Sequence, residues 1–343
     1  MKKIVFLRIN PKAVGGAEKY LQRVVYVLKQ NGIKHEIRSF NGNQKIPSWL
    51  KALKFNHQVC KQKSKDEIYF SLERVGCADI YRAGDGVHKV YRNQKKLWFL
   101  NPLNFVYPYL ERKCFENSKK IITNSNFIKD QIIKTYNINP QKIQTIYNGV
   151  NLPNKVDKVK TKTEICAKFN LDLKKPLILF VGSGFKRKGV KEFLTILKNL
   201  NSNYSSIIIG KDKNIKKYIN LTKNLGLDTL FLGVRDDVNK FYEASDIFVF
   251  PTYYEPFSNV ILEALSYGCV CFTTKQNGAS EILDNEFIMN SPNDLKISKT
   301  IDKFLNNASL LQTQSQKNIE ISKKFSIENN VKLTMEIINE NLY

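Results

Sequence analysis

Two glutamates, Glu255 and Glu263, lie close together in the C-terminal half of the 343-residue chain. Asp246–Phe250 precedes them and predicts a buried strand, and Ser258 between them suits the N-cap of a helix. The free N–H groups of a first helical turn attract an anion such as a diphosphate. Carboxylates beside such a site are useful where they accept hydrogen bonds from neighbouring hydroxyl groups, so we expect sugar or ribose ligands. The alternative is two solvated surface residues.

A cationic turn follows a second predicted buried strand, Leu177–Val181. The turn reads Gly182-Ser-Gly-Phe-Lys-Arg187-Lys188-Gly189, and its glycines allow close backbone approach to a ligand. Three consecutive cations suit a diphosphate leaving group. The spacing is neither that of a P-loop nor that of a complete dinucleotide fingerprint. The alternative is a charged turn that only ends the strand.

A Gly-Gly turn, Gly15-Gly16, joins the first predicted strand to a helix over residues 17–30. At a cleft between two domains, the start of this helix would contact bound phosphates or a second substrate. Gly-Gly before a helix is also ordinary turn chemistry, so this turn alone has little specificity.

Strand-like runs alternate with helix-like runs along the whole chain, which predicts parallel sheets covered by helices on both faces. We therefore expect an α/β fold with two doubly wound, Rossmann-like domains and a ligand cleft at the carboxyl ends of the strands. The polar, lysine-rich segment 148–162 is interpreted as a linker. The predicted strands are Lys3–Leu7, Lys34–Ser39, Glu67–Ser71, Ala78–Tyr81, Lys120–Thr123, Lys142–Ile146, Leu177–Val181, Ser205–Ile209, Thr229–Leu232, Asp246–Phe250 and Val270–Thr273.

Composition restricts the choice of partners. The 55 Lys and Arg residues exceed the 31 Asp and Glu residues, which gives a net charge of +24. A basic surface attracts nucleic acid, an anionic membrane or phosphorylated small molecules.

With three histidines a zinc site is not expected, and Cys269 and Cys271 are interpreted as core thiols of a reducing compartment. Arg8 interrupts the first apolar run too early for a signal peptide.

Taken in order and spacing, these segments resemble the family-4 retaining glycosyltransferases of the GT-B fold. The matching pieces are Gly15-Gly16-Ala17-Glu18, Asn124-Ser125 to Asn148-Gly149-Val150, Val181 to Gly189, Asp246 to Pro251, Glu255 with Glu263, and Gly278-Ala-Ser-Glu281. The resemblance implies an N-terminal acceptor-binding domain over 1–152, a nucleotide-sugar-binding domain over 153–325, and a helix over 326–343 that packs back on the first domain.

The resemblance also implies site roles. Arg187 and Lys188 would hold the donor diphosphate, Glu263 the ribose and Glu255 the transferred sugar. Further donor contacts would come from Gly15, Gly16, Gly182, Val234, Phe257, Ser258 and Asn259. Ser183 stands where many relatives have arginine, which is similar to the lipopolysaccharide core glucosyltransferases and leaves open which cation dominates.

A polar loop in the N-terminal half contains Arg82, Asp85 and His88 around two glycines, after the strand expected at Ala78–Tyr81. Relatives carry a functional His or Asp in this region. We therefore expect Asp85 and His88 to contact the transferred sugar or the acceptor hydroxyl. A polar loop with satisfied turn residues is the alternative.

Cations and aromatic residues interleave over residues 92–113. One interpretation is a segment that enters the interface of an anionic membrane. The other is a helix that packs its aromatic residues into the N-terminal core.

The sequence thus predicts a metal-independent hexosyltransferase without a cofactor. It would move a hexose from a UDP- or GDP-sugar to a hydroxyl of a glycan or lipid-linked acceptor, with retention, in lipopolysaccharide or cell-surface polysaccharide synthesis. A cytoplasmic location is expected, peripheral on the inner-membrane surface. No nucleic-acid-binding motif is recognised, so nucleic acid is not an expected partner. The alternatives are a basic nucleic-acid-binding protein and a GT-B relative with phosphorylase or epimerase activity.

Overall fold

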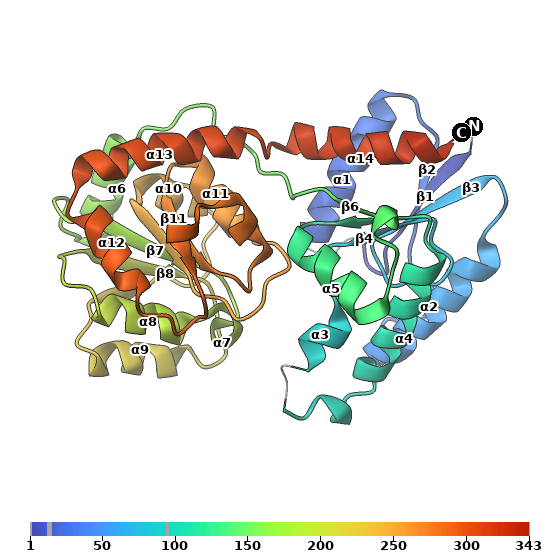
Figure 1. Ribbon diagram of the computed structural model, residues 1–343, viewed down its shortest axis with the longest axis horizontal. Helices are drawn as coiled ribbons and strands as arrows, with labels where there is room; N and C mark the ends of the chain where they lie inside the picture. The colour runs from blue at the N-terminus through green and yellow to red at the C-terminus, as the bar shows by residue number, and fades with distance from the viewer. Residues whose placement is uncertain (1, 12–15, 94–95, 343) are drawn as a thin grey trace. The chain divides into compact units, whose positions relative to one another are not determined.

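The computed structural model describes residues 2–11, 16–93 and 96–342 (Figure 1). The chain forms two compact units. The first, here called the N-terminal domain, contains Met1–Tyr147 and Glu328–Tyr343, and the second, the C-terminal domain, contains Asn148–Ile327.

The N-terminal domain has a six-stranded parallel sheet in the order β2-β1-β3-β4-β5-β6. Its strands are β1 (Lys3–Leu7), β2 (His35–Arg38), β3 (Glu67–Ser71), β4 (Ile80–Ala83), β5 (Lys120–Thr123) and β6 (Ile143–Thr145). Its α-helices are α1 (Gly16–Gln30), α2 (Ser48–Gln62), α3 (His88–Arg92), α4 (Leu103–Asn117), α5 (Asn126–Tyr136) and α14 (Ile327–Leu342).

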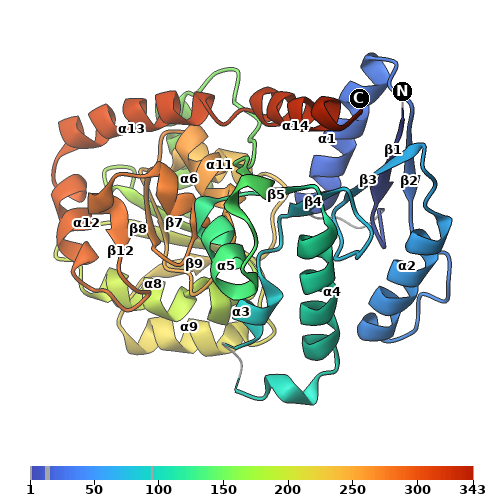
Figure 2. The same ribbon diagram turned by 45° about the vertical axis from the view of Figure 1, so that its right-hand side comes forward.

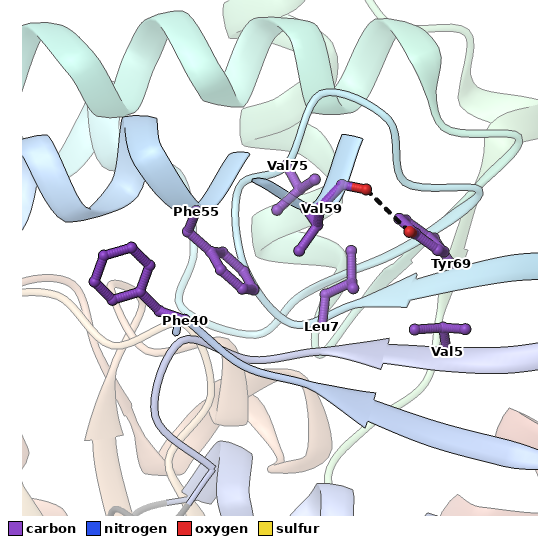
Figure 3. Close-up of a cluster of buried hydrophobic side chains, with 7 residues drawn as sticks. All are labelled: Val5, Leu7, Phe40, Phe55, Val59, Tyr69 and Val75. Carbon is purple, nitrogen blue, oxygen red and sulfur yellow. Dashed lines mark hydrogen bonds between the residues drawn. The ribbon is translucent and has the colours of Figure 1, made fainter. Parts of the chain in front are cut away.

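Helices cover both faces of this sheet, which is why its inner strands β3 and β4 are buried along their whole length. The last helix, α14, packs against α1 (Figure 2), where the hydroxyls of Tyr20 and Thr334 lie 2.9 Å apart. Under α2 the core contains Leu7, Phe55 and Val59 (Figure 3).

The C-terminal domain has a second six-stranded parallel sheet, in the order β12-β11-β10-β7-β8-β9. Its strands are β7 (Leu177–Val181), β8 (Ser205–Ile209), β9 (Thr229–Phe231), β10 (Ile247–Phe250), β11 (Val270–Thr274) and β12 (Ile288–Met289). Its α-helices are α6 (Lys158–Phe169), α7 (Phe185–Lys188), α8 (Val190–Lys198), α9 (Ile215–Asn224), α10 (Val238–Ala244), α11 (Asn259–Ser266), α12 (Ile297–Leu305) and α13 (Ala308–Lys323).

Each sheet has a point at which the strand order reverses. In the N-terminal domain it lies between β1 and β3, and in the C-terminal domain between β7 and β10. Two consecutive loops diverge to opposite sides at such a point, so a crevice opens there at the carboxyl ends of the strands. The expected α/β, doubly wound architecture is confirmed.

Several local expectations need correction. The strand expected at Ala78–Tyr81 is β4 at Ile80–Ala83. The expected linker ends earlier than residue 162, because Asp157 caps α6 by accepting a hydrogen bond from Lys160 N. Cys269 and Cys271 are buried free thiols as expected. Two other cysteines, Cys60 in α2 and Cys77 after β3, form a disulfide, which neither their spacing nor the expected reducing compartment indicated.

Gly189 allows two segments of the C-terminal domain to approach closely. Its φ is +81°, in the left-handed region, and a Cβ atom there would lie 1.9 Å from the carbonyl oxygen of Pro251. Because that neighbour is backbone, it has little freedom to move away. Gly189 therefore brings the cationic turn after β7 against the segment after β10.

Gly189→Ala tests this packing. Left-handed strain alone costs about 1–2 kcal/mol for a residue with a side chain, and the clash with Pro251 adds to it. We expect a loss of about 3 kcal/mol or more in the unfolding free energy of the C-terminal domain. Gly226→Ala is the matched control, since Gly226 has a φ of +67° but open space around it. Equal losses in the two variants, measured by urea unfolding, would contradict the close-packing account.

Candidate functional site

The carboxylate of Glu255 is the centre of a charged cluster in the C-terminal domain. Its Oε2 atom accepts a 2.7 Å hydrogen bond from the Arg187 guanidinium and another from Lys188 Nζ. The two cations follow β7, Glu255 follows β10, and these strands are paired. The three side chains therefore meet at the point where the strand order reverses, which is where doubly wound sheets bind their ligands.

Backbone hydrogen bonds join the cationic turn to the loop after β10. The carbonyl oxygen of Arg187 accepts hydrogen bonds from Tyr253 N at 3.0 Å and from Thr252 Oγ1 at 3.1 Å. The Arg187 guanidinium also donates to the carbonyl oxygen of Tyr254 at 2.9 Å. The two loops thus form one hydrogen-bonded unit.

The backbone of Glu255 is held on its other side as well. Its N–H donates to the carbonyl oxygen of Gln276, and its carbonyl oxygen accepts from Gly278 N, both at 2.9 Å. These bonds form a short parallel bridge with Asn277, a buried residue whose amide donates to Thr273 Oγ1 at 3.0 Å. The Glu255 carboxylate is therefore positioned by the fold itself, before any ligand binds.

Lys188 lies in an unusual environment for a lysine. Its ammonium group is largely buried and lies 5.1 Å from the centre of the Phe250 ring. Burial lowers the pKa of Lys188 below its ordinary 10.5, partly offset by the negative charge of Glu255. The ion pair with Glu255 thus compensates a cation that is costly to bury.

A hydrogen bond from a buried tyrosine orients the carboxylate of Glu263. It lies within α11, and its Oε2 atom accepts a 2.9 Å hydrogen bond from Tyr242 OH. Burial raises the pKa of Tyr242 well above 10.0, and the charge of Glu263 raises it further, so the phenol stays protonated and donates. This partner could not be foreseen from the sequence, because Tyr242 lies in α10 at a position typical of the core.

The start of α11 lies directly after the Glu255 loop. Ser258 takes the expected N-cap position and is buried. The expected N-cap is therefore confirmed, although the Ser258 hydroxyl makes no capping hydrogen bond to α11 in the part of the chain that is described. A bound anion or water is left to satisfy the N–H groups of the first helical turn.

The other residues expected to contact the donor are distributed around this cluster. Gly182 follows β7 directly, and Phe257 adjoins Ser258 and is buried. Asn259 is exposed, and its Oδ1 atom accepts a 2.8 Å hydrogen bond from Asn148. Val234 follows β9 and is 65% exposed. Gly16 begins α1 of the N-terminal domain, whereas Gly15 lies outside the described residues. Their donor-binding roles stay predictions.

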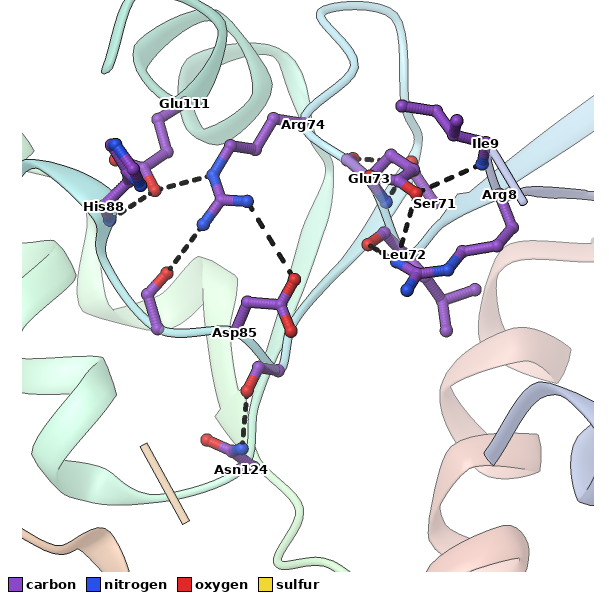
Figure 4. A network of polar contacts seen from close by, with 12 residues as sticks. Arg8, Ile9, Ser71, Leu72, Glu73, Arg74, Asp85, His88, Glu111 and Asn124 are labelled. Atoms are coloured by element: carbon purple, nitrogen blue, oxygen red, sulfur yellow. Dashed lines mark hydrogen bonds and ion pairs between the residues drawn. The ribbon is translucent and has the colours of Figure 1, made fainter. Parts of the chain in front are cut away.

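The point of strand-order reversal in the N-terminal domain also carries paired charges (Figure 4). Arg8, which follows β1, lies 2.7 Å from Glu18 and 3.1 Å from Glu73, which follows β3. Glu73 also accepts a 3.1 Å hydrogen bond from Ile9 N. Burial raises the pKa of Glu73, and the charge of Arg8 opposes that shift. The sequence interpretation used Arg8 only as a break in an apolar run and missed this role.

Arg74 and Glu111 form a second, fully buried ion pair in this domain. The Arg74 Nε atom donates to Glu111 at 2.8 Å. The Glu111 carboxylate also accepts hydrogen bonds from the backbone N of His88 at 2.7 Å and from Tyr136 OH at 2.7 Å. Glu111 thereby holds the first turn of α3. Glu111 is a charged residue among the buried positions of α4, and this pattern in the sequence could have indicated the pair.

The structure only partly brings together the polar residues of the Asp85 loop. Asp85 is 60% exposed, and its carboxylate lies 4.0 Å from Arg74. The His88 ring lies 2.8 Å from Asn104 Oδ1 (Nε2 to oxygen). Arg82 lies in β4, since the strand extends two residues further than expected, and it is buried with its guanidinium 3.8 Å from the Tyr20 ring centre. A Cβ atom at Gly84 would lie 3.9 Å from Arg82 Nε, so the Arg82 side chain does reach one of the two glycines.

The segment between α3 and the middle of α4 exposes several large apolar side chains. The exposed fractions of these residues are 63% for Leu97, 53% for Phe99, 68% for Leu100, 53% for Phe105 and 53% for Tyr109. Of the two interpretations of this segment, packing of the aromatic residues into the core does not hold for Phe99, Phe105 and Tyr109. None of the helices in residues 2–11, 16–93 and 96–342 has both the length and the apolar character to cross a membrane. The same residues contain no His, Cys, Asp and Glu group arranged to hold a metal ion.

Comparison with known proteins gives the family. Residues 161–324 match "Glycosyl transferases group 1", and residues 69–153 match "Glycosyltransferase Family 4". The UDP-Gal:alpha-D-GlcNAc-diphosphoundecaprenol alpha-1,3-galactosyltransferase of Escherichia coli is 30% identical over 253 residues, which cover 69% of this chain and 65% of that protein. The chain spans about half the length of other curated relatives, 45% and 49% of two of them.

Solved structures share the fold along nearly the whole chain. The crystal structure of WaaG, a glycosyltransferase involved in lipopolysaccharide biosynthesis, has a TM-score of 0.80 at 18% identity and covers 98% of this chain and 99% of its own. Anabaena HepE in complex with UDP-glucose has a TM-score of 0.77 at 16% identity, covering 99% and 100%. The fold is thus that of the GT-B glycosyltransferases, and the chain belongs to the glycosyltransferases, with a family 4 region at 69–153 followed by a group 1 domain at 161–324.

Proposed function

We propose that this chain transfers a hexose, with retention, from a nucleoside-diphosphate sugar to a hydroxyl group of a glycan or glycolipid acceptor. The observation that carries the proposal is the cluster of Glu255, Arg187 and Lys188 where the strand order of the second sheet reverses. It combines cations for a diphosphate with a carboxylate for hydroxyl groups.

Departure of the nucleoside diphosphate needs stabilisation of negative charge. Arg187 and Lys188 supply two positive charges, and the start of α11 supplies oriented N–H groups beside them. These groups are held in place by the fold, so little reorganisation accompanies the reaction. No step of this proposal requires a metal ion or a cofactor.

Glu255 takes two successive partners in this mechanism. In the structure its Oε2 atom pairs with both cations. A bound diphosphate competes for Arg187 and Lys188, which frees Glu255 to accept hydrogen bonds from the transferred sugar. Glu263, held by Tyr242, then binds the ribose hydroxyls.

The acceptor side belongs to the N-terminal domain in this proposal. Asp85 offers an exposed carboxylate near the carboxyl end of β4, close to Arg74. His88 lies three positions further on, with its backbone fixed by Glu111. We assign Asp85 and His88 to the transferred sugar or the attacking hydroxyl, where they orient the reacting groups.

The comparisons support the choice of substrates. A relative is named for transfer from UDP-Gal to a diphosphoundecaprenol-linked sugar, and one structural neighbour was crystallised with UDP-glucose. Another neighbour is described as acting in lipopolysaccharide biosynthesis. We therefore propose a UDP- or GDP-hexose donor and a lipid-linked acceptor, for lipopolysaccharide or cell-surface polysaccharide.

We also propose that the enzyme works in the cytoplasm, bound peripherally to an anionic membrane. The exposed apolar side chains of residues 97–109 support this, since lysines and arginines such as Lys96, Arg112 and Lys113 lie beside them in sequence. Apolar side chains enter the boundary between headgroups and acyl chains while cations attract anionic lipids. The net charge of +24 adds to that attraction.

Glu255→Ala tests the donor site. We expect release of UDP or GDP from the matching nucleotide sugar to fall about 100-fold or more, because the sugar loses its positioning group. A screen of UDP-, GDP- and ADP-hexoses with wild-type chain first identifies the donor. Lys223→Ala, an exposed position of α9, is the control and keeps full activity. Unchanged turnover in Glu255→Ala would remove Glu255 from the mechanism.

Lys188→Arg tests the buried cation. Burial lowers the pKa of Lys188 below 10.5, so the lysine loses its charge at a lower pH than an exposed lysine does. The KM for the donor of the wild-type chain should therefore rise as the pH increases from 7 through that lowered pKa. Arginine stays charged throughout this range, so the rise in KM moves to higher pH in the variant. Identical pH profiles, each scaled to its own maximum, would show that Lys188 does not bind the donor as a cation.

Leu97→Ser combined with Leu100→Ser tests membrane binding. We expect wild-type chain to float with anionic liposomes, and the double variant to lose about tenfold or more of that binding because two apolar contacts are removed. Val159→Ser, which changes an exposed apolar residue of the C-terminal domain, is the matched control. Equal flotation of wild type with anionic and neutral liposomes, or of the double variant with wild type, would overturn the proposed contact.

A further inference from the structure

One face of α4 contacts His88 at three positions. The Glu111 carboxylate accepts a hydrogen bond of 2.7 Å from the backbone N of His88 (Figure 4). The ring of Tyr107 meets the His88 ring edge-on, with 5.0 Å between the ring centres. The side-chain oxygen of Asn104 lies 2.8 Å from His88 Nε2. Positions 104, 107 and 111 are spaced by three and four residues, so they share one helix face. Helix α4 therefore holds both the backbone and the ring of His88.

The Asn104 amide has only one possible orientation in this network. Its nitrogen, Nδ2, donates a hydrogen bond of 2.6 Å to the carbonyl oxygen of Trp98. A carbonyl oxygen has no proton to donate, so the amide nitrogen must face it. The amide oxygen, Oδ1, therefore faces His88, and an amide oxygen only accepts hydrogen bonds. Asn104 is thus an acceptor toward His88, and Trp98 fixes it in that role.

The orientation of this amide determines which nitrogen of His88 carries a proton. Because Oδ1 of Asn104 accepts, His88 Nε2 must be the donor. A neutral imidazole has one donor nitrogen and one acceptor nitrogen. In the neutral ring Nδ1 is therefore the acceptor, whichever group it meets. The hydroxyl group of a sugar is a donor that suits such an acceptor.

A proline one turn further along α4 explains how the main chain of Asn104 is held. Pro108 has no N–H, so it cannot donate to the carbonyl oxygen of Asn104 as the residue four positions on does in an ordinary helix. The Arg92 guanidinium donates to that oxygen instead. Its Cζ atom also lies 4.1 Å from the centre of the Trp98 ring. Asn104 is thus held by Trp98 through its side chain and by Arg92 through its main chain.

An amide is not the side chain that packing alone favours at position 104. The Asn104 side chain lies in the first turn of α4 and is only 3% exposed. Burying an amide costs free energy unless its atoms are hydrogen-bonded. A leucine would fill this position without that cost. The amide is therefore explained by the two groups that it joins, the Trp98 carbonyl and the ring of His88.

We propose that Asn104 is a positioning residue for the transfer reaction. It holds the His88 ring with Nε2 as the donor and Nδ1 as the acceptor for a hydroxyl group of the substrate. Asn104 contacts no reacting group in this account and acts only through His88. The inference rests on the proposed transferase function for its substrate, but the state of the His88 ring can be measured without any substrate.

NMR of the full-length chain with ¹⁵N-labelled histidine tests the state of the ring, in buffer alkaline enough to keep imidazole neutral. The chain has three histidines, and the structure predicts a different signal for each. His88 should show a slowly exchanging proton on Nε2. His35 should carry its proton on Nδ1, because that atom lies 2.8 Å from the carbonyl oxygen of Ile33. His57 is exposed and should exchange its proton rapidly with water. A His88 proton on Nδ1, or one that exchanges as fast as that of His57, would overturn the inference.

Two substitutions at Asn104 test its effect on the reaction. Asn104→Ala removes the acceptor, so the slow Nε2 proton of His88 should disappear. We expect kcat to fall about tenfold or more while the KM for the donor changes less than about twofold, because the main proposed donor contacts lie in the C-terminal domain. Asn104→Asp keeps an acceptor for Nε2, so the proton and part of kcat should return. Asn203→Ala, exposed in the C-terminal domain, is the control and should change neither.

The combined results separate the positioning role from the transferase function. Urea unfolding shows whether each variant is folded, and the wild-type NMR signals decide the ring state even if Asn104→Ala is not. A folded Asn104→Ala chain with unchanged kcat would overturn the inference, with or without the His88 proton. A wild-type chain that turns over no nucleotide sugar, yet shows the His88 proton and loses it in Asn104→Ala, would contradict the transferase function and support the positioning of His88.

Discussion

The ion pairs of Glu255 with Arg187 and Lys188 are the interaction on which the proposed donor site depends. Three features bring these charges together: the pairing of β7 with β10, the missing side chain at Gly189, and the backbone bridge between Glu255 and Asn277. A buried lysine such as Lys188 would be costly without its carboxylate partner. The fold thus holds two cations and one carboxylate close enough that a diphosphate and a sugar can take over the same contacts.

The N-terminal domain also contains buried charged side chains that need partners of opposite charge. Its buried charges, Arg74 with Glu111 and Arg8 with Glu73, are paired within the domain and fix the loops after β1, β3 and β4. They act as structural supports for the more exposed Asp85. The two domains therefore divide the work in our proposal: cations and oriented N–H groups hold the donor, and Asp85 and His88 orient the reacting groups.

Much of this structure could be predicted from local sequence. Buried parallel strands are continuous apolar runs, so β1, β3, β5, β7 and β8 were assigned with their observed bounds. The cluster around Glu255 was predictable because its residues follow such strands directly. Partners from distant segments were not: Tyr242 beneath Glu263, Glu111 beside Arg74, and the Cys60–Cys77 disulfide depend on packing that no local pattern records. The strand expected to end at Tyr81 continues to Ala83, so Arg82 lies within β4 and not after it.

The most direct test of the central claim is a crystal structure of the chain with its UDP- or GDP-hexose donor. The account predicts that Arg187 and Lys188 contact the diphosphate, that the Glu255 carboxylate has left at least one cation to accept a hydrogen bond from a sugar hydroxyl, and that Glu263 binds the ribose. A diphosphate bound away from both cations, with Glu255 still paired to Arg187 and Lys188, would contradict it.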